Sequence, residues 1–395
     1  MLLLNSLPAY NTPLDPVDAE YLGVEAAKTV ERVQKQRQDF AETPLESLQG
    51  LARQTGVASI HIKDESKRLG LGSFKALGGS YAVVRLVLEE AARKLGRNVE
   101  IEELQSAAVR DVAKTMTFGC ATDGNHGKSV AAGAKMLGAR AVIFVHSGVS
   151  DERVAAIAQF GADITRVEGT YDDSVKEAEA VCSRNGWIVL SDTSWPGYER
   201  IPRLVMQGYT AMLSEVLHKL PDAPTHVFVQ AGVGGLAAAV AAHFDIVFGD
   251  RRPKMIVVEP DRAACIFEST RRGKLTKVDH QDSTIMAMLE CYEPSMTAWE
   301  VLSRKADAFQ TVGESDAVVA MKQLAQPVGD DPSIVSGESG SAGLAGFLSI
   351  ANEKDILKAL GITAQSRLLF FNTEGATDRA SYQALVGKTP EMVLG

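Results

Sequence analysis

Between about residue 113 and residue 192, short apolar segments alternate with longer segments whose apolar residues have helical spacing. The predicted helices of this region end at Gly138, Gly161 and Gly186, and a new apolar segment follows each glycine. This order is typical of a parallel β-sheet that helices cover on both faces. The predicted strands are 115–118, 141–146, 164–167 and 187–191.

A second alternating series follows a long predicted helix at 201–219, and its predicted strands are 226–230, 255–259 and 367–371. The 395 residues are also too many for one ordinary hydrophobic core. We therefore expect an α/β protein with two doubly wound parallel-sheet domains. The large domain would comprise residues 1–95 and 200–395, and the small domain residues 96–199. In such sheets a ligand binds at the carboxyl ends of the strands.

The segment Thr43-Pro44-Leu45-Glu46 predicts the start of a helix. A capping threonine is followed there by a proline at the first helical position and a glutamate at the third. We expect this helix to end at Gly56, and a strand at 57–62 to follow it.

That strand leads to Leu71-Gly72-Ser73-Phe74-Lys75-Ala76-Leu77-Gly78-Gly79. Lys75 has small or apolar neighbours, and the glycines on either side let backbone or a flat ligand approach closely. A lysine whose ammonium form loses solvation becomes a nucleophilic amine that can form a Schiff base. A lysine that opens an amphipathic helix more often faces water, so a catalytic role for Lys75 depends on the motifs that follow.

Composition and charge exclude several functional classes. The net charge of -9 argues against a nucleic-acid or anionic-membrane partner, because phosphate binding needs a basic face. No segment approaches the roughly 20 apolar residues that a membrane span needs. The N-terminus has no positive region before its short apolar run, so we expect a cytoplasmic protein without a signal peptide.

The cysteines and histidines do not predict a metal site, because the four cysteines lack CxxC spacing and no HExxH motif occurs. Cys265 and Cys291 would pair only if the fold brought them together, and the reduced state is expected in the cytosol.

Gly232-Val233-Gly234-Gly235 follows a predicted strand and opens a predicted helix, so its backbone N–H groups could bind a phosphate. The segment also fits a Gly-x-Gly-x-x-Ala dinucleotide fingerprint that ends at Ala237, and Glu259 ends the next strand where a ribose-binding acid would stand. An NAD(P)-dependent oxidoreductase is therefore an alternative. A glycine-rich helix start without a ligand is another.

Polar residues follow two predicted strands of the small domain. Thr122, Asp123 and Asn125 stand between a strand and a helix, where they could bind an anion such as a substrate carboxylate or form a plain turn. Asp192 directly follows the predicted strand 187–191, where a helix-capping role is as plausible as a ligand-binding one. The loops 336–343 and 372–375 could also be plain turns.

Together these motifs resemble the pyridoxal-phosphate enzymes of fold type II, the tryptophan-synthase-β-like family. Their order and spacing agree over most of the chain from about residue 43. The matching segments are Lys63-Asp64-Glu65-Ser66, Gly72-Ser73-Phe74-Lys75, Gly124-Asn125-His126-Gly127 and the Gly232 to Gly235 loop.

The resemblance implies a pyridoxal 5'-phosphate cofactor and a role for each matching residue. Lys75 would hold the cofactor through a Schiff base, and Phe74 would pack beside its ring. Asn125 would hydrogen-bond the phenolic oxygen, and Gly232, Val233, Gly234 and Gly235 would bind the phosphate. Thr373 would meet the pyridine nitrogen, and a neutral hydroxyl there suits β-elimination better than transamination.

Within the family, Ala121-Thr122-Asp123-Gly124 is most similar to the lyases that remove ammonia from 2,3-diaminopropionate, because the threonine and serine dehydratases carry a small residue in place of Asp123. The implied reaction is α,β-elimination from the D or L isomer, which yields pyruvate and two ammonia. Thr122, Asp123 and Asp192 would bind this small amino acid, and Lys75 and Asp123 would act on opposite faces of it.

The resemblance also implies a homodimer. The family resemblance is also supported by Gln207-Gly208-Tyr209, Gln230-Ala231-Gly232-Val233-Gly234, Ser336-Gly337-Glu338-Ser339-Gly340 and Thr373-Glu374-Gly375. A serine, threonine or hydroxyaspartate dehydratase with the same cofactor remains an alternative.

Overall fold

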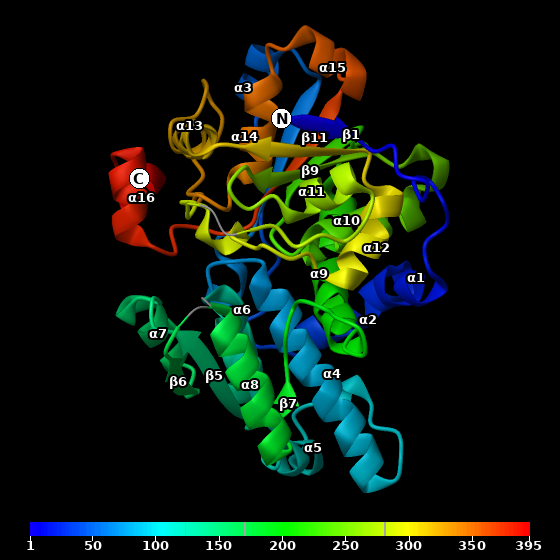
Figure 1. Cartoon of the computed structure of the whole chain (residues 1–395), viewed down its shortest axis with the longest axis vertical. Helices are drawn as coiled ribbons and strands as arrows, with labels where there is room; N and C mark the ends of the chain where they lie inside the picture. The colour runs from blue at the N-terminus through cyan, green and yellow to red at the C-terminus, as the bar shows by residue number, and fades with distance from the viewer. Residues whose placement is uncertain (123, 170, 280–281) are drawn as a thin grey trace. The chain divides into compact units, whose positions relative to one another are not determined.

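The computed structural model describes residues 1–122, 124–169, 171–279 and 282–395. The chain forms two compact units. The first unit contains residues 1–24, 42–74 and 212–395, and the second contains residues 25–41 and 75–211 (Figure 1). Each unit is built on its own sheet.

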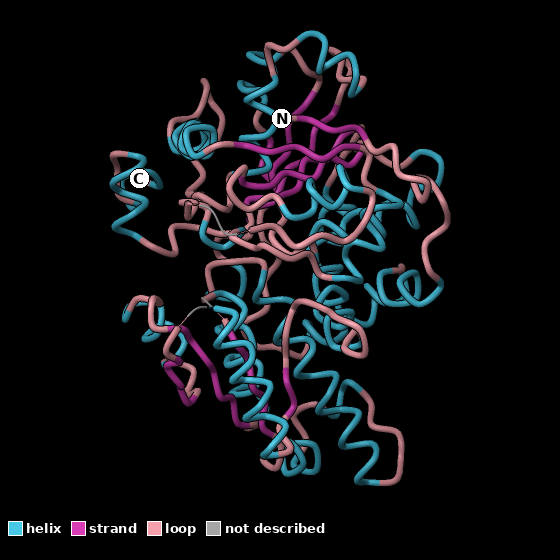
Figure 2. The backbone as a smooth tube through the Cα atoms, in the orientation of Figure 1, coloured by secondary structure: helices cyan, strands magenta, loops and turns pink. Residues whose placement is uncertain are grey.

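Seven strands of the described chain form the sheet of the first unit, in the spatial order β1, β10, β9, β8, β11, β3, β2. Strands are magenta in Figure 2. The five central strands are parallel, and the edge strands β1 and β2 run antiparallel to their neighbours. The strand bounds are β1 Leu2–Leu4, β2 Leu45–Ser47, β3 Ser59–Asp64, β8 His226–Gln230, β9 Lys254–Pro260, β10 Ala308–Val312 and β11 Arg367–Asn372.

An aromatic cluster joins this sheet to one of its helices. Phe228 of β8 and Phe370 of β11 are partners in the sheet, and Phe347 of α14 (Ala342–Ile350) lies 5.7 Å and 5.9 Å from their ring centroids. All three side chains are buried. The other helices of this unit are α1 Pro16–Leu22, α3 Gln49–Thr55, α10 Gly235–Phe248, α11 Cys265–Arg272, α12 Met296–Lys305, α13 Glu314–Ala325, α15 Lys354–Leu360, α16 Arg379–Val386 and α17 Pro390–Leu394.

The second unit has a parallel sheet in the order β6, β5, β4, β7. Its strands are β4 Thr117–Ala121, β5 Arg140–His146, β6 Asp163–Val167 and β7 Ile188–Val189. Its helices are α4 Lys75–Leu95, α5 Ala107–Ala113, α6 Asn125–Leu137, α7 Asp151–Ala158, α8 Tyr171–Asn185 and nearly all of α2 Val24–Lys35. Helix α9 (Arg200–Lys219) begins in the second unit and ends in the first.

Helices α4 and α6 pack closely because small residues line their contact. A methyl group at Gly133 would lie 2.8 Å from Cα of Ser80, so the two backbones could not approach this closely with a side chain there. Ser129 Oγ accepts from the Ser80 N–H at 2.9 Å and donates to the Ala76 carbonyl at 3.2 Å. This packing holds the first turn of α4 against α6.

The two parallel sheets agree with the predicted α/β fold, but one predicted helix start was wrong. Leu45–Ser47 is the edge strand β2, and the helix begins only at Gln49. Thr43 does not cap it, because its hydroxyl donates to Glu65 at 2.6 Å in the protein interior. The edge strands β1 and β2 and the buried strand β10 were not predicted.

The compact units do not coincide with the predicted domains. Helix α4 lies in the second unit, because it packs on α6 there. The predicted domains, residues 1–95 with 200–395 and residues 96–199, stay a prediction.

A buried cluster of four charged side chains lies beside β3. Lys63 Nζ is 2.5 Å from Glu215 Oε2, and Arg68 contacts both Glu65 and Glu215 at 2.7 Å. Thr43 adds its hydroxyl and its carbonyl oxygen as further hydrogen-bond partners. We call Lys63, Glu65, Arg68 and Glu215 the ion cluster. Its two positive and two negative charges balance, which a buried site requires.

Replacing Arg68 with methionine should lower the free energy of unfolding by about 3–5 kcal/mol, because the buried Glu65 and Glu215 carboxylates lose their common cation. Urea unfolding followed by circular dichroism measures this loss. Arg93→Met is the matched control, since Arg93 also pairs with a glutamate three residues earlier, Glu90, but its side chain is 70% exposed. It should change stability little. Equal losses in the two variants would contradict a special role for the ion cluster.

Candidate active site

Three neighbouring strands of the first unit end at the same edge of its sheet, because β8, β11 and β3 are adjacent and parallel. Strand β8 continues into the glycine loop 231–234, and β11 continues into Thr373. Strand β3 continues into the segment 65–74, which leads to Lys75 at the start of α4. The sheet therefore gathers three of the predicted cofactor-binding segments at one edge.

The glycine loop opens α10 and forms a narrow cradle. Gly234 is the residue before the helix and has a left-handed φ of 100°. A methyl group there would lie 2.9 Å from Ile266 Cδ1, and one at Gly232 would lie 2.9 Å from Cys291 Sγ. The first N–H groups of a helix have no intrahelical acceptor and attract anions. The cradle therefore fits a phosphate group held by backbone donors.

Glu259, the candidate ribose-binding acid of a nicotinamide enzyme, has another function in the structure. Its two carboxylate oxygens accept the N–H groups of Ile266 and Phe267 at 2.8 Å and 2.7 Å, at the start of α11. The side chain is buried, and this burial raises the pKa of Glu259 to about 8. Both Glu259 oxygens accept N–H groups of α11. The dinucleotide interpretation needed this acid to bind a ribose, so the structure does not support that interpretation.

Thr373 connects two of the segments at this edge. Its carbonyl oxygen accepts the N–H of Phe74 at 2.9 Å, directly before Lys75 in the chain. Its hydroxyl oxygen accepts from Gln230 Nε2 at 2.9 Å, directly before the glycine loop. Thr373 is buried.

In the second unit, Lys75 and Asp192 form an ion pair through Lys75 Nζ and Asp192 Oδ2. Their side chains are only 21% and 15% exposed. Burial would raise the pKa of Asp192, but the Lys75 ammonium and His126 hold it well below its ordinary value. The sequence suggested an apolar setting for Lys75. The structure instead places a carboxylate at the amine, which stabilises its charged form.

Thr122 and Asn125 lie at the start of α6, where β4 ends. Thr122 Oγ1 accepts the N–H groups of Gly124 and Gly127 at 3.1 Å and 3.2 Å, so this oxygen caps the helix. Asn125 is the first residue of α6 and is buried. Asp123, the predicted second base, lies outside the described residues.

His126 is a site residue that the sequence analysis named only as part of a motif. Its Nε2 lies 3.2 Å from the Leu190 carbonyl, two residues before Asp192. Because a carbonyl only accepts, Nε2 carries the proton and Nδ1 is an acceptor. Nδ1 is buried without a hydrogen-bond partner among the described residues. Burial is the main cause of the lowered pKa of His126, which favours the neutral ring.

The structure thus brings Lys75 and Asp192 into contact. Asn125 and Asp192 follow two neighbouring parallel strands, because β4 precedes Asn125 and β7 precedes Asp192. Tyr209 of α9 was also part of a motif only. It packs against the first turn of α4, where a methyl group at Gly78 would lie 2.6 Å from its ring. The motifs contain His126 and Tyr209, but only contacts between distant segments show what the two side chains touch.

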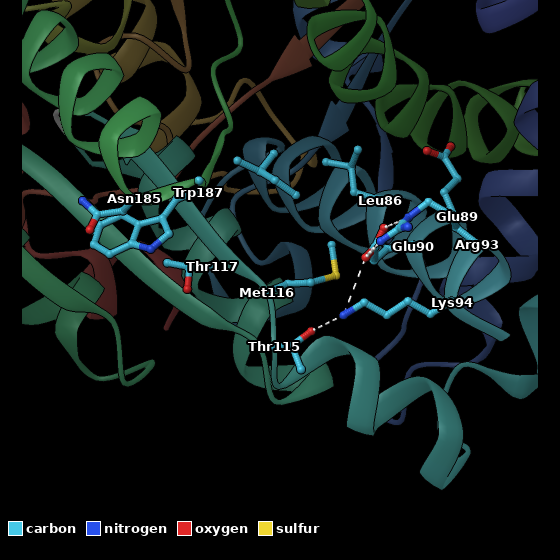
Figure 3. Close-up of a pocket in the computed structure, with 12 residues that line it drawn as sticks. Leu86, Glu89, Glu90, Arg93, Lys94, Thr115, Met116, Thr117, Asn185 and Trp187 are labelled. Atoms are coloured by element: carbon cyan, nitrogen blue, oxygen red, sulfur yellow. Dashed lines mark hydrogen bonds and ion pairs between the residues drawn. The ribbon is translucent and has the colours of Figure 1, made fainter.

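A cavity of about 570 Å³ lies in the second unit beside the first residues of β4 and β7 (Figure 3). Arg93 and Lys94 on its wall both pair with Glu90. The carboxyl end of β4 leads to Asn125, so this cavity lies at the opposite end of the sheet from the candidate active site.

The cysteines are free thiols, Cys265 and Cys291 included. Among the described residues, no group of three or more histidine, cysteine or acidic side chains is arranged to hold a metal ion. No helix in the described ranges is long and apolar enough to cross a membrane.

Comparison with known proteins gives a family and several close relatives. The family model for pyridoxal-phosphate dependent enzymes matches residues 37–362. The diaminopropionate ammonia-lyase of Escherichia coli strain K12 is 37% identical over 366 residues, which is 91% of each chain. That of Salmonella typhimurium strain LT2 is 36% identical over 89% of each chain. A probable D-serine dehydratase of Rhizobium etli is 27% identical over 57% of this chain and 51% of its own length.

A solved structure resembles the chain over nearly its full length. It is the Escherichia coli diaminopropionate ammonia lyase in complex with an aminoacrylate-PLP azomethine reaction intermediate. Its TM-score is 0.88 at 35% sequence identity, with 98% of this chain and 96% of that chain covered. A threonine deaminase of Solanum lycopersicum, at 21% identity and a TM-score of 0.73, shares the fold.

Replacing His126 with asparagine should reduce the loss of stability on acidification. Burial lowers the pKa of His126, so below about pH 6.5 the unfolded chain binds a proton that the folded chain does not. The free energy of unfolding of the wild type therefore decreases as the pH is lowered. Asparagine does not titrate. Urea unfolding between about pH 7.5 and pH 5.5 measures the slope.

His243→Asn is the matched control, because burial also lowers the pKa of His243 and its Nδ1 lies 2.8 Å from the Leu22 carbonyl in the first unit. It should reduce the slope similarly. An unchanged slope in His126→Asn beside a reduced slope in the control would show that folded His126 is charged.

Proposed function

Because the chain belongs to the pyridoxal-phosphate dependent enzyme family, we propose that it is a carbon–nitrogen lyase that removes ammonia from 2,3-diaminopropionate. The β-ammonium group leaves as ammonia, and the remaining enamine hydrolyses to pyruvate and a second ammonia. One water is consumed for each substrate molecule. The contact that carries this proposal is the pairing of Lys75 with Asp192 at the start of α4.

The residues fit pyridoxal 5'-phosphate. The glycine cradle supplies backbone donors for a phosphate, and Thr373 supplies a neutral hydroxyl at the same sheet edge. When bound, the cofactor supplies an electron sink for the substrate α-carbon. Phe74 would pack beside its ring, and Asn125 would hydrogen-bond its phenolic oxygen.

Lys75 moves a proton at the substrate α-carbon. Its amine needs to be held in one position, and the Asp192 carboxylate provides this through the ion pair. Because the pKa of Asp192 is held below its ordinary value, this carboxylate stays charged at neutral pH. It then also attracts an ammonium group of the substrate.

Asp123 acts from the opposite face of the substrate to Lys75. A carboxylate there attracts the β-ammonium of 2,3-diaminopropionate in preference to the hydroxyl of serine, and it accepts the α-proton of the isomer that Lys75 does not serve. Thr122, which caps the adjoining helix, orients this segment.

The protein works as a homodimer in the cytoplasm, in amino-acid catabolism. The family resemblance supports the dimer, and the free state of the four cysteines agrees with a reducing compartment.

Replacing Lys75 with alanine should lower the rate of pyruvate formation by about 10²–10⁴-fold or more, because the proton carrier at the α-carbon is lost. The visible absorption band of a lysine-linked cofactor should disappear as well. Lys67→Ala is the control, because Lys67 is an exposed lysine of the same segment. Full activity in Lys75→Ala would overturn the assignment. Keto acid formed only from hydroxy amino acids by the wild-type enzyme would identify a dehydratase.

Replacing Asp123 with asparagine should affect the two substrate isomers unequally. The isomer whose α-proton goes to Asp123 should lose about 10²–10⁴-fold in turnover, and the other should lose much less. Pyruvate assays with separate D- and L-2,3-diaminopropionate measure this split. Equal losses for both isomers would show that Asp123 binds substrate without acting as a second base.

A further inference from the structure

The side-chain amide of Gln230 is surrounded by acceptors. Its Nε2 lies 2.7 Å from the Gly340 carbonyl, 3.0 Å from the Phe371 carbonyl and 3.1 Å from the Ser339 carbonyl. The fourth neighbour is Thr373 Oγ1 at 2.9 Å. Three of these four groups are carbonyl oxygens, which only accept.

This crowding fixes the direction of one hydrogen bond. An amide NH₂ has two hydrogens and no lone pair for a hydroxyl to donate to. Thr373 therefore accepts from Gln230, and its own hydrogen must point elsewhere. Within the described residues, the structure shows no hydrogen bond donated by the Thr373 hydroxyl.

The position of Thr373 suggests which acceptor its hydroxyl group serves. Thr373 is 3% exposed, and its backbone is tied to Phe74, one residue before Lys75. Gln230 ends the strand that opens the glycine cradle. The hydroxyl thus belongs to the cofactor-binding edge of the first unit, and the cofactor carries one ring nitrogen with a lone pair.

The Oε1 atom of Gln230 indicates that this residue does more than pack in the interior. Oε1 is buried without a hydrogen-bond partner in the described chain, and a methyl group at Gly343 would lie 2.9 Å from it. A buried acceptor without a donor costs free energy. An apolar side chain of similar size would avoid that cost but would lack the donor group that faces Thr373 and the three carbonyl oxygens.

We propose that Gln230 is a positioning residue that makes the Thr373 hydroxyl a hydrogen-bond donor toward the pyridine nitrogen, and so keeps this nitrogen an unprotonated acceptor. The proposal rests on the proposed function. An unprotonated ring withdraws electrons less strongly, which limits the reaction to loss of a β-substituent.

The test is the ¹⁵N NMR signal of the pyridine nitrogen in holoenzyme loaded with ¹⁵N-labelled cofactor. The wild-type signal should be that of an unprotonated nitrogen that accepts a hydrogen bond. Gln230→Met removes the donor and frees the Thr373 hydroxyl to rotate, so the signal should move away from the wild-type position. The value of kcat should fall about tenfold, as expected for one lost hydrogen bond in the transition state, with little change in KM.

A double-mutant cycle separates this role from a structural one. Thr373→Val should displace the signal by itself, and Thr373→Ser, which keeps the hydroxyl, should not. Gln230→Met added to Thr373→Val should cause no further displacement, because Gln230 acts through Thr373. If Gln230→Met does not fold, Gln230→Asn replaces it, since its amide is one methylene too short to reach Thr373.

Gln310→Met is the matched control. Gln310 lies in β10 of the same sheet, and both glutamines are 2% exposed. Its Nε2 also donates to a carbonyl and a hydroxyl, those of Gly346 and Ser349, and its Oε1 is also buried without a partner among the described residues. This variant carries the same packing change and should leave the ¹⁵N signal unmoved.

A wild-type signal in Gln230→Met, or a further displacement in the double variant, would overturn the proposal. Failure of the proposed function looks different. In that case wild-type enzyme with bound cofactor would form no pyruvate from 2,3-diaminopropionate, whatever the nitrogen signal.

Discussion

The buried ion cluster is the constraint on which the path of the chain into Lys75 depends. Lys63 and Glu215 anchor the end of β3, and Arg68 joins them to Glu65 in the segment that follows. That segment bends sharply at Leu69, whose φ of 50° is unfavourable for a residue with a side chain. Four mutually satisfied charges hold this conformation in an interior where none of them could be left alone. The chain then enters α4 at Lys75.

The second unit completes the positioning by close packing. Gly133 lets α6 approach Ser80 of α4, and the two helices begin at Asn125 and Lys75. Because β4 and β7 are neighbours, the segment before α6 and the segment that carries Asp192 leave the sheet at one edge. His126 then bonds the Leu190 carbonyl and ties the two segments together. The lysine and its carboxylate are therefore fixed by contacts that lie outside the ion pair itself.

The sequence predicted most of the regular architecture, because alternating strands and helices leave a periodic pattern and end in glycines. It failed where long-range contacts override local signals. The capping pattern at Thr43 was wrong because its hydroxyl donates to Glu65, and the ion cluster joins residues 152 positions apart in Lys63 and Glu215. Lys75 and Asp192 were each predicted, but their pairing was not. No single-sequence pattern shows that a glutamine before a glycine loop faces a threonine 143 positions away.

The groups that would hold the phosphate and the ring nitrogen of the cofactor differ in kind from those that would act on the substrate. The first unit offers neutral donors, namely the helix-terminal N–H groups, the Thr373 hydroxyl and the Gln230 amide behind it. Even Glu259, one strand from the glycine loop, is turned away to cap α11. The second unit offers charges, in Lys75 and Asp192. A neutral setting of this kind would keep the ring nitrogen unprotonated without a competing ion pair. The Asp192 carboxylate has Lys75 as its cationic partner, and under the proposed function it would next meet the β-ammonium group that distinguishes a diamino acid from a hydroxy amino acid.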